Sequence, residues 1–410
     1  MGHSPAPDRS HSTDTDTSTG PGTGPGITVI GGGLAGLTAA ITAAEAGAHV
    51  TLHEAHHTLG GRARTAEGPY AVNDGPHALY RRGPHWHWLR RRGLLGPLAN
   101  PPLREAARFR FHHGGALRRT PPAALFALAR RSAERAPADV DFLTWATERA
   151  GRATARAAAH YVAVALFHHD PGSLSAAFVQ ERLRRAAALP PEARYPAGGW
   201  GGLSGRMAGH ARNLGVRIET SSRIDTLPDG PVVVATSLDA ARRLLKDDGL
   251  RWPSGRTLLI DLALRTRRGD PFVVSDLDAP GWLERFTAQD PSLAPAGEQL
   301  IQGQIPIGPD TPRATGVARA EHLLDVGFPG WRERTVWRRE ALANGRTGAV
   351  DPPGTTWRDR PRIDRGGTGV FLAGDQVAAP GVLSEVAFTS GITAASLALK
   401  SLTGVPTGGS

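Results

Sequence analysis

The first apolar pattern of the chain predicts a strand, a turn, a helix and a second strand. Residues 27–30 are apolar or β-branched, residues 31–36 are rich in glycine, and half of residues 37–46 are alanine. Residues 50–53 form a second strand-like run, which ends on Glu54. Short apolar runs bounded by glycine are typical of buried strands, and alanine favours a helix. We therefore expect a β-α-β unit here.

The rest of the chain alternates between helical and strand-like patterns. We expect helices at about 84–95, 123–134, 140–159, 176–188, 202–214, 317–325, 331–343 and 380–402, and strands at 216–220, 223–226, 232–236, 256–265, 271–275, 299–307 and 369–375. Helical patterns dominate from about 100 to 190, which indicates a helical insertion. The α/β character returns near 195 and again near the C-terminus, so separate pieces of the chain are expected to build one domain.

The glycine-rich turn has the spacing of a dinucleotide-binding site. Gly31 allows a tight turn, Gly33 lets the backbone approach a pyrophosphate, and Gly36 lets the helix pack closely on the strand. Leu34 and Ala35 open the helix, and at a helix N-terminus free N–H groups and the helix dipole favour the negative charge of a pyrophosphate.

The acidic residue at the end of the second strand supports the same interpretation. Glu54 follows the turn by roughly 20 residues, where a carboxylate can hold ribose hydroxyls. Its negative charge would repel a 2′-phosphate, so NADP is disfavoured at this site. The strand, the glycine turn, the helix and the acid together indicate the site more specifically than a glycine triplet alone.

Composition narrows the function classes. The chain has 410 residues and no cysteine, which excludes disulfides, a thiolate nucleophile and a cofactor attached through sulfur. The net charge is +10, but only Lys246 and Lys400 are lysines, and the arginines are dispersed along the chain. A solvated arginine-rich surface therefore accounts for the charge better than a nucleic-acid-binding tract does.

No segment has the pattern of a signal peptide or a stable membrane anchor. Residues 1–26 are mostly small and polar, which predicts a disordered leader. Residues 27–44 carry no charge, but the glycines of the dinucleotide-binding turn interrupt them, so we do not interpret them as a membrane helix. We expect a cytoplasmic protein without membrane insertion.

Further motifs follow in a fixed order. They are GGGLAG (31–36), Glu54, GGRART (60–65), DGPH (74–77), YPAGG (195–199), LAGD (372–375) and PGVLSE (380–385). In this order they resemble the superfamily of flavin-dependent amine oxidases, protoporphyrinogen oxidases and phytoene desaturases. The resemblance implies an α/β fold, in which a Rossmann-type FAD-binding domain is interleaved with a second α+β substrate domain that carries the helical insertion.

The resemblance divides the chain into seven segments. We expect the leader (1–26), three FAD-binding parts (27–98, 195–250 and 363–402), a helical substrate part (99–194), a substrate part with a sheet and helices (251–362), and a tail (403–410). Ligands commonly bind at the interface between two such domains.

The resemblance also implies FAD as the cofactor. By position in the motifs, Gly60, Gly61 and Arg62 would lie beside the pyrophosphate and the flavin. The backbone of Ile224 would reach the adenine. The turn that begins at Asp74 and Gly75 would pass near the flavin ring.

The C-terminal motifs would complete the flavin site. Gly374 and Asp375 end a strand, and Asp375 would bind a ribityl hydroxyl. Leu383 and Ser384 open the last helix and would face the O2 edge of the flavin. A helix N-terminus stabilises the negative charge that a reduced flavin carries there.

Departures from the amine oxidase pattern favour the desaturase-like branch. Many amine oxidases of this superfamily use a lysine near flavin N5, yet Lys246 and Lys400 do not fall on substrate-domain strands. They also use a tyrosine of the C-terminal motif as one wall of an aromatic cage, whereas 380–385 contains none and Leu383 is its largest side chain. We therefore expect a dehydrogenase or desaturase that transfers hydride from a C–C or C–N bond of an apolar or aromatic small molecule to flavin N5.

Four residues are candidates for contact with the substrate. His77 follows Pro76 in the turn near the flavin, and histidine serves as an acid or base near neutral pH; a structural histidine is the alternative. Gln302 and Gln304 alternate on one strand and so face the same side, which is either the cavity or the solvent. Trp200 either walls the pocket or fills the core.

Several questions stay open in the sequence. The histidine pairs lack the cysteine or paired carboxylate that would complete a metal site, so we expect none. A cyclase or isomerase that uses FAD without net redox change would need the same motifs. The substrate, the electron acceptor (oxygen, a quinone or another) and the oligomeric state do not follow from the residues.

Overall fold

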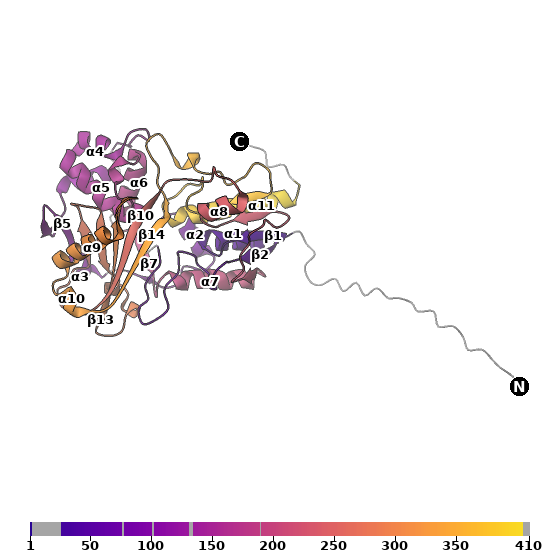
Figure 1. Ribbon diagram of the computed structural model, residues 1–410, viewed down its shortest axis with the longest axis horizontal. Coiled ribbons are helices and arrows are strands. Elements are labelled where there is room, and N and C mark those ends of the chain that lie inside the picture. Colours follow the sequence, from indigo (N-terminus) through magenta and orange to yellow (C-terminus); the bar gives the residue numbers. More distant parts are fainter. Residues whose placement is uncertain (2–25, 76–77, 101, 131–133, 189, 405–410) are drawn as a thin grey trace.

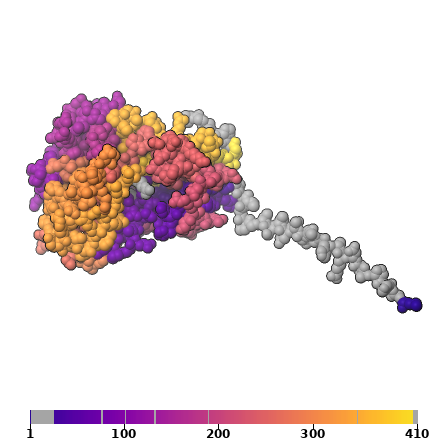
Figure 2. Space-filling view, in the orientation of Figure 1, coloured from indigo at the N-terminus to yellow at the C-terminus, as the bar shows by residue number. Residues whose placement is uncertain are grey.

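The computed structural model describes residues 1, 26–75, 78–100, 102–130, 134–188 and 190–404. Two halves are visible in Figure 1, one built on a parallel sheet with α1, α7, α8 and α11, and the other on a larger sheet with α9 and a group of three helices. In Figure 2 the indigo, red and yellow segments of the first half lie beside the magenta and orange segments of the second. The expected leader lies outside the described residues, except for its two ends.

The first half is a parallel five-stranded sheet with the order β15-β9-β1-β2-β8. Its strands are β1 (Gly26–Ile30), β2 (His49–His53), β8 (Arg217–Glu219), β9 (Val232–Val234) and β15 (Val370–Leu372). Three regions far apart in the chain therefore contribute to one sheet. The middle strand β1 is apolar and has neighbours on both sides, as is typical of a buried parallel strand.

Helices cover the parallel sheet and form the main core with it. They are α1 (Leu34–Glu45), α2 (Pro84–Arg91), α7 (Trp200–Asn213), α8 (Leu238–Leu245) and α11 (Ser384–Leu402). Helix α1 packs against α11 and α7. Within the described residues, no helix combines the length and the apolarity needed to cross a membrane.

The second half is a seven-stranded sheet with the order β14-β10-β13-β12-β11-β5-β6. Its strands are β5 (Phe109–His113), β6 (Ala116–Arg118), β10 (Ser254–Arg265), β11 (Val273–Asp276), β12 (Gly281–Arg285), β13 (Glu298–Pro306) and β14 (Thr335–Ala349). Helix α9 (Arg313–Gly327) packs on this sheet, and a second core lies among α4 (Phe142–Ala150), α5 (Arg152–Leu166) and α6 (Ala176–Ala186).

Short elements connect the two halves. A three-stranded sheet contains β3 (Leu79–Tyr80), β7 (Ala193–Pro196) and β4 (Leu98–Ala99). Helices α3 (Leu103–Ala106) and α10 (Trp331–Arg334) are single turns.

The prediction of a helix at 331–343 was wrong. Only Trp331–Arg334 is helical, and the chain then continues as the long edge strand β14. The arginine, glutamate and alanine of this stretch favour a helix locally, but β10 offers a long row of unpaired backbone groups and β14 pairs with it over most of its length. Backbone pairing across the sheet outweighed the local preference.

Other boundaries also differ from the prediction. The helix expected at 140–159 is two helices, because Gly151 has a φ of 77° and separates α4 from α5. Residues Ala123–Ala129 form a 3-10 helix, residues 223–226 are not a strand, and β5, β6 and β12 were not predicted.

We expect Gly36→Ala to destabilise the fold and Gly205→Ala to be tolerated. A Cβ at Gly36 would lie 1.8 Å from the Gly31 carbonyl oxygen, which forces α1 away from β1 and should cost about 1–3 kcal/mol or more. A Cβ at Gly205, exposed in α7, meets nothing within 4 Å, so alanine should gain about 0.5–1 kcal/mol. Calorimetric melting of the two variants measures this; equal melting temperatures would contradict it.

Candidate functional site

A cavity of about 2190 Å³ extends between the two halves, and residues of both line it. One end lies against β1 and the N-terminus of α1, and the other lies against the seven-stranded sheet. The residues expected to bind the cofactor and several aromatic residues that the sequence analysis did not select therefore share one cavity.

The glycine-rich turn forms a close-packed cradle at the first end. Gly31 has a φ of 108°, and a Cβ there would lie 2.6 Å from the Ala235 carbonyl oxygen, so only glycine fits. Gly33 precedes α1 and forms a bridge with Gly60. Leu34 and Ala35 line the cavity, whereas Gly36 lies behind them at the helix–strand contact.

Glu54 is held beside this turn. Its carboxylate accepts hydrogen bonds from the Gly32 N–H at 2.7 Å and the His56 N–H at 2.9 Å. The side chain is buried within the protein and lines the cavity. Ile224 and Ser222 line the same end, and the Ser222 N–H donates to the Glu54 carbonyl at 2.8 Å. The acid and the residue expected near the adenine thus lie together.

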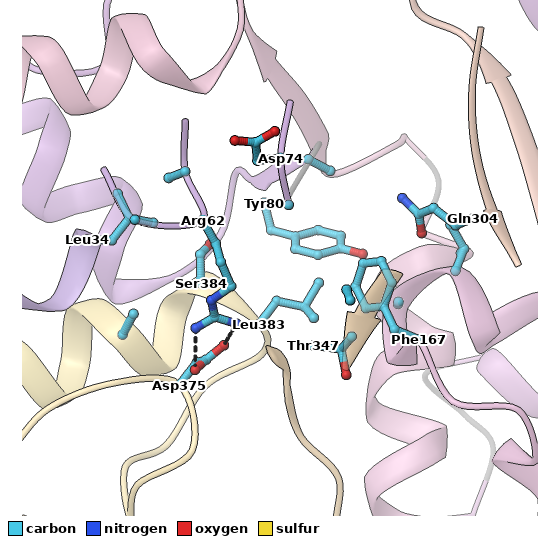
Figure 3. Close-up of a pocket in the computed structure, with 18 of the residues that line it drawn as sticks. Leu34, Arg62, Asp74, Tyr80, Phe167, Gln304, Thr347, Asp375, Leu383 and Ser384 are labelled. Atoms are coloured by element: carbon cyan, nitrogen blue, oxygen red, sulfur yellow. Dashed lines mark hydrogen bonds and ion pairs between the residues drawn. The ribbon is translucent and has the colours of Figure 1, made fainter. Parts of the chain in front are cut away.

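Arg62 and Asp375 meet in the middle of the cavity. The Arg62 Nη1 and Nη2 atoms donate to the two carboxylate oxygens of Asp375, each at 2.7 Å (Figure 3). Gly60 and Gly61, both with positive φ, make the turn that leads to Arg62, and Gly374 with a φ of 154° leads to Asp375. The pair connects two segments that lie 313 positions apart in sequence.

A chain of polar contacts, partly exposed at Asp74 and buried at Asp261, connects Asp74 to the second sheet. Arg64 lies 3.2 Å from one carboxylate oxygen of Asp74, and Arg339 Nη1 donates to the other at 2.9 Å. The Nε atom of Arg339 donates to Asp261 at 2.8 Å, and Gln302 Nε2 donates to the same carboxylate at 2.8 Å. Burial raises the pKa of Asp261, which the Arg339 charge opposes.

The start of α11 is held in an unusual conformation. Leu383 has a φ of 55° although it is not glycine, which costs about 1–3 kcal/mol. Glu385 accepts from the Val382 N–H at 3.0 Å and from Arg185 Nη2 at 2.8 Å, so the turn is fixed from behind. Leu383 and Ser384 line the cavity at this point. The contacts of Glu385 with Val382 and Arg185 therefore hold the N-terminus of α11 against the cavity.

Aromatic side chains wall the second end of the cavity. Tyr80, Phe167 and Leu383 project into the same part of the space, with Gln304 nearby (Figure 3). Other aromatic residues line it further along the sheet: Phe109, Phe111, Phe126, Tyr161, Tyr195, Phe272 and Trp282. Burial raises the pKa of Tyr80 to about 12, so its hydroxyl stays protonated near neutral pH.

Glu284 lies among these aromatic residues. It belongs to β12, lines the cavity and is 5% exposed. Its carboxylate accepts from Trp282 Nε1 at 3.0 Å and from Gln289 Nε2 at 3.2 Å. Burial raises the pKa of Glu284 to about 7, although hydrogen bonds from Trp282, Tyr195 and Gln289 act in the opposite direction. This carboxyl can therefore gain or lose a proton near neutral pH.

The residues predicted to contact the substrate lie in different environments in the structure. Gln304 lines the cavity, but Gln302 is buried against Asp261 and does not. Trp200 is completely buried in the core of the first half, which favours the second of its two interpretations. Pro76 and His77 lie outside the described residues, while Asp74 and Gly75 line the cavity.

The sequence analysis did not select Tyr80, Phe167 or Glu284. Tyr80 ends the glycine- and proline-rich stretch after Asp74, and its position after a turn near the expected flavin was the signal available. Pro280 and Gly281 indicate a turn, and Trp282 and Glu284 then alternate with Leu283 in the period-2 pattern of a short strand. Lys246 and Lys400 do not line the cavity.

Outside the cavity, the histidine pair His112 and His113 lies beside two carboxylates of a distant segment, Asp276 and Asp278. His112 Nδ1 lies 2.9 Å from Asp276 and 3.9 Å from Asp278, and these atoms are close enough together to surround an ion. However, the N–H groups of Gly114 and Gly115 already donate to Asp278 at 2.9 Å each. Internal hydrogen bonds account for the cluster.

The raised pKa of Glu284 predicts a pH-dependent stability. The folded state holds this proton more tightly than the unfolded state, in which the pKa of the carboxyl is 4.5. The contribution of Glu284 to the free energy of unfolding is therefore fully present below about pH 4.5 and is lost as the pH rises to about 7. The loss is about 3 kcal/mol. In calorimetry, Glu284→Gln should therefore melt higher relative to the wild type at pH 8 than at pH 5. Glu298→Gln, the same change on β13 outside the cavity, should not; parallel behaviour of both would contradict the assignment.

Comparisons with known proteins agree with this architecture. Residues 29–93 match the model of the NAD(P)-binding Rossmann-like domain. A search of curated protein sequences gives no match. The chain resembles the structure of an oxidoreductase from Methanosarcina mazei, with a TM-score of 0.72, 16% identity and coverage of 90% of this chain and 99% of that one.

Two further structures have the same arrangement. Cyclohexylamine oxidase from Brevibacterium oxydans gives a TM-score of 0.68 at 18% identity, with coverage of 93% of this chain and 100% of that one. Reduced UDP-galactopyranose mutase gives a TM-score of 0.66 at 14% identity, with coverage of 94% and 96%. The expected fold class is confirmed: the chain has the Rossmann-type α/β fold shared by amine oxidases and UDP-galactopyranose mutase.

Proposed function

We propose that this chain is an FAD-dependent oxidoreductase that removes hydride from a C–C or C–N bond of an apolar or aromatic small molecule, such as a specialised metabolite. The observation that carries the proposal is the cavity that joins the glycine-rich cradle to the aromatic chamber. A nucleotide cofactor at one end and an apolar substrate at the other would meet inside one cavity.

The residues of the first end fit FAD. Only glycine fits at Gly31, and the backbone at Gly33 is open to a close approach by a pyrophosphate. The Glu54 carboxylate beside them suits ribose hydroxyls. Arg62 would contribute positive charge beside the pyrophosphate, and Asp375 would accept from a ribityl hydroxyl. When bound, FAD supplies the hydride acceptor.

The chain itself would contribute mainly positioning. The aromatic walls exclude water and orient an apolar substrate, which can supply much of the rate of a hydride transfer. The α11 N-terminus, held by Glu385 and Arg185, would favour negative charge near Leu383. Tyr80 and Phe167 would contact the substrate on the side of the cavity that Leu383 faces.

The amine oxidase alternative keeps one supporting observation. The C-terminal motif lacks an aromatic residue, but Tyr80 and Phe167 come from other segments and project to the same place (Figure 3). Oxidation of a C–N bond therefore stays within the proposal, as does the likeness to cyclohexylamine oxidase.

A second candidate is the use of FAD without net redox change, as in a cyclase or isomerase. The likeness to UDP-galactopyranose mutase favours this candidate, because a mutase rearranges its substrate.

An absorption spectrum of the purified protein, followed by anaerobic titration with candidate substrates, tests the proposal. Flavin bands that bleach with a substrate are the expected result. Turnover without bleaching would support the non-redox candidate. A colourless protein that does not take up added FAD would overturn both.

We expect Gly33→Ala to weaken FAD binding without unfolding the protein. A Cβ at Gly33 would meet only the Gly60 carbonyl oxygen, at 3.9 Å, and its φ of −78° suits alanine. The added methyl group would instead occupy the backbone approach to the pyrophosphate, and we expect at least about a tenfold loss of affinity. Fluorescence titration of the apoprotein with FAD measures this. Unchanged affinity would contradict the cradle, and the melting temperature of the apoprotein is the control for folding.

A further inference from the structure

Glu284 differs from the other buried carboxylates in how its charge is compensated. Most of them face an arginine or histidine, as in the pairs Arg285–Glu105, Arg339–Asp261, Arg334–Asp270, His112–Asp276, Arg360–Asp351 and Arg185–Glu385. Glu54 and Asp290 instead accept hydrogen bonds from backbone N–H groups. Among the described residues, Glu284 has neither a cationic partner nor a backbone donor, and it lines the cavity. A buried charge of this kind is costly unless a cation pairs with it.

The polar atoms around Glu284 are neutral donors to its carboxylate and two buried amide oxygens. Gln289 donates its amide N–H to Glu284, and its buried oxygen has no hydrogen-bond partner among the described residues. Gln302 is opposite Glu284 in the ladder between β12 and β13, and its amide N–H must face the Asp261 carboxylate. Its buried oxygen likewise has no partner in the described part of the chain. Neither glutamine lines the cavity, so Glu284 is the group of this polar cluster that a ligand can reach, and a carboxylate favours a ligand group with N–H donors.

Aromatic rings surround the same place. Trp282, which donates to Glu284, packs edge to face with Phe109 at 5.4 Å and with Tyr161 at 6.2 Å between ring centroids. All three rings line the cavity. The negative faces of aromatic rings attract cations, and most strongly where water is excluded.

We propose that Glu284 anchors an ammonium group of the substrate, so that the substrate is an apolar or aromatic molecule with a basic nitrogen. The carboxylate pairs with the cation, and the rings of Trp282, Phe109 and Tyr161 enclose it. This inference rests on the proposed function, which places the reacting bond at the flavin end. Glu284 thereby fixes which part of the molecule reaches that end.

Calorimetric titration of the whole chain, with whatever cofactor it carries after purification, tests the anchor with three probes of one shape. They are 3-phenylpropylamine, 3-phenylpropan-1-ol and 3-phenylpropanoate. The amine should bind at least about tenfold more tightly than the alcohol, because only the amine supplies a positive charge. Equal binding of amine and alcohol would overturn the proposal, and so would tighter binding of the carboxylate.

Two matched variants assign the preference to the residue. Glu284→Gln should reduce the affinity for the amine at least about tenfold and leave the affinity for the alcohol nearly unchanged. Glu298→Gln, on the same sheet but outside the cavity, should change neither. If Glu284→Gln keeps the full preference for the amine, the anchor lies elsewhere and the proposal is wrong.

A pH series of the wild type gives the same answer without relying on a variant. Primary ammonium groups titrate near 10, like lysine, so the probe stays charged between about pH 5.5 and pH 8. Glu284, with a pKa of about 7, loses its charge over this range, so the affinity should fall as the pH falls. Burial raises the pKa of the adjacent Tyr195 far above neutrality, and the Asp261–Arg339 pair is retained in Glu284→Gln. A wild-type affinity that does not depend on pH would overturn the proposal.

The two proposals fail in different ways. A protein that shows flavin bands but no preference for the amine loses only the anchor. A protein that binds the amine through Glu284 but takes up no FAD loses the oxidoreductase and keeps the anchor.

Discussion

The rest of the structure depends on the close contact between α1 and β1. The Gly36 position leaves no room for a Cβ, since one would lie 1.8 Å from the Gly31 carbonyl oxygen. Because the helix packs this tightly on the strand, its N-terminus opens directly at the end of β1, beside Glu54 and Ala235. Gly391 of α11 makes a similar approach to α1, where a Cβ would lie 2.5 Å from the Ala35 carbonyl oxygen. The first and last helices are thereby fixed relative to each other, and their N-termini both line the cavity.

A partly buried network of charged side chains connects this half to the second sheet. Arg339 pairs with Asp74 beside the glycine turns and with Asp261 in the middle of the large sheet. The desolvation of Asp261 is costly, so its carboxylate needs good geometry with Arg339, and removal of Arg339 would leave a buried charge without its cationic partner. These contacts therefore hold the two halves in one relative position. Asp261 and Glu284 belong to the same sheet but differ in their partners. Asp261 pairs with Arg339, whereas Glu284 accepts only from neutral groups among the described residues and lines the cavity.

Local sequence signals predicted the first half well and the second half poorly. The motifs around Gly31, Glu54, Arg62 and Asp375 are each short and continuous in sequence, so each carries its own geometry. The second sheet is assembled by pairing between distant strands, so β14 formed from a segment with helical residues, and β12 was too short to stand out. Trp200 is an aromatic residue of the kind that often lines a pocket, but it is buried in the core. Its burial follows from the packing of α7 against the rest of the first half, and the local sequence does not show this packing. Tyr80, Phe167 and Glu284 line the cavity and were not selected from the sequence for the same reason.

The charges that line the cavity act at different ranges. Arg81 and Arg82 line it and are exposed to solvent, so salt screens their repulsion of a cation over about 8 Å at physiological ionic strength. Glu284 is buried among rings and amides, where screening is weak and the effective dielectric constant is low. An ammonium group that reaches the chamber therefore meets a stronger attraction than the repulsion it passed near the surface. Selection by charge would then occur inside the chamber, where the substrate is already oriented, so the same contact would determine both recognition and which bond faces the flavin end.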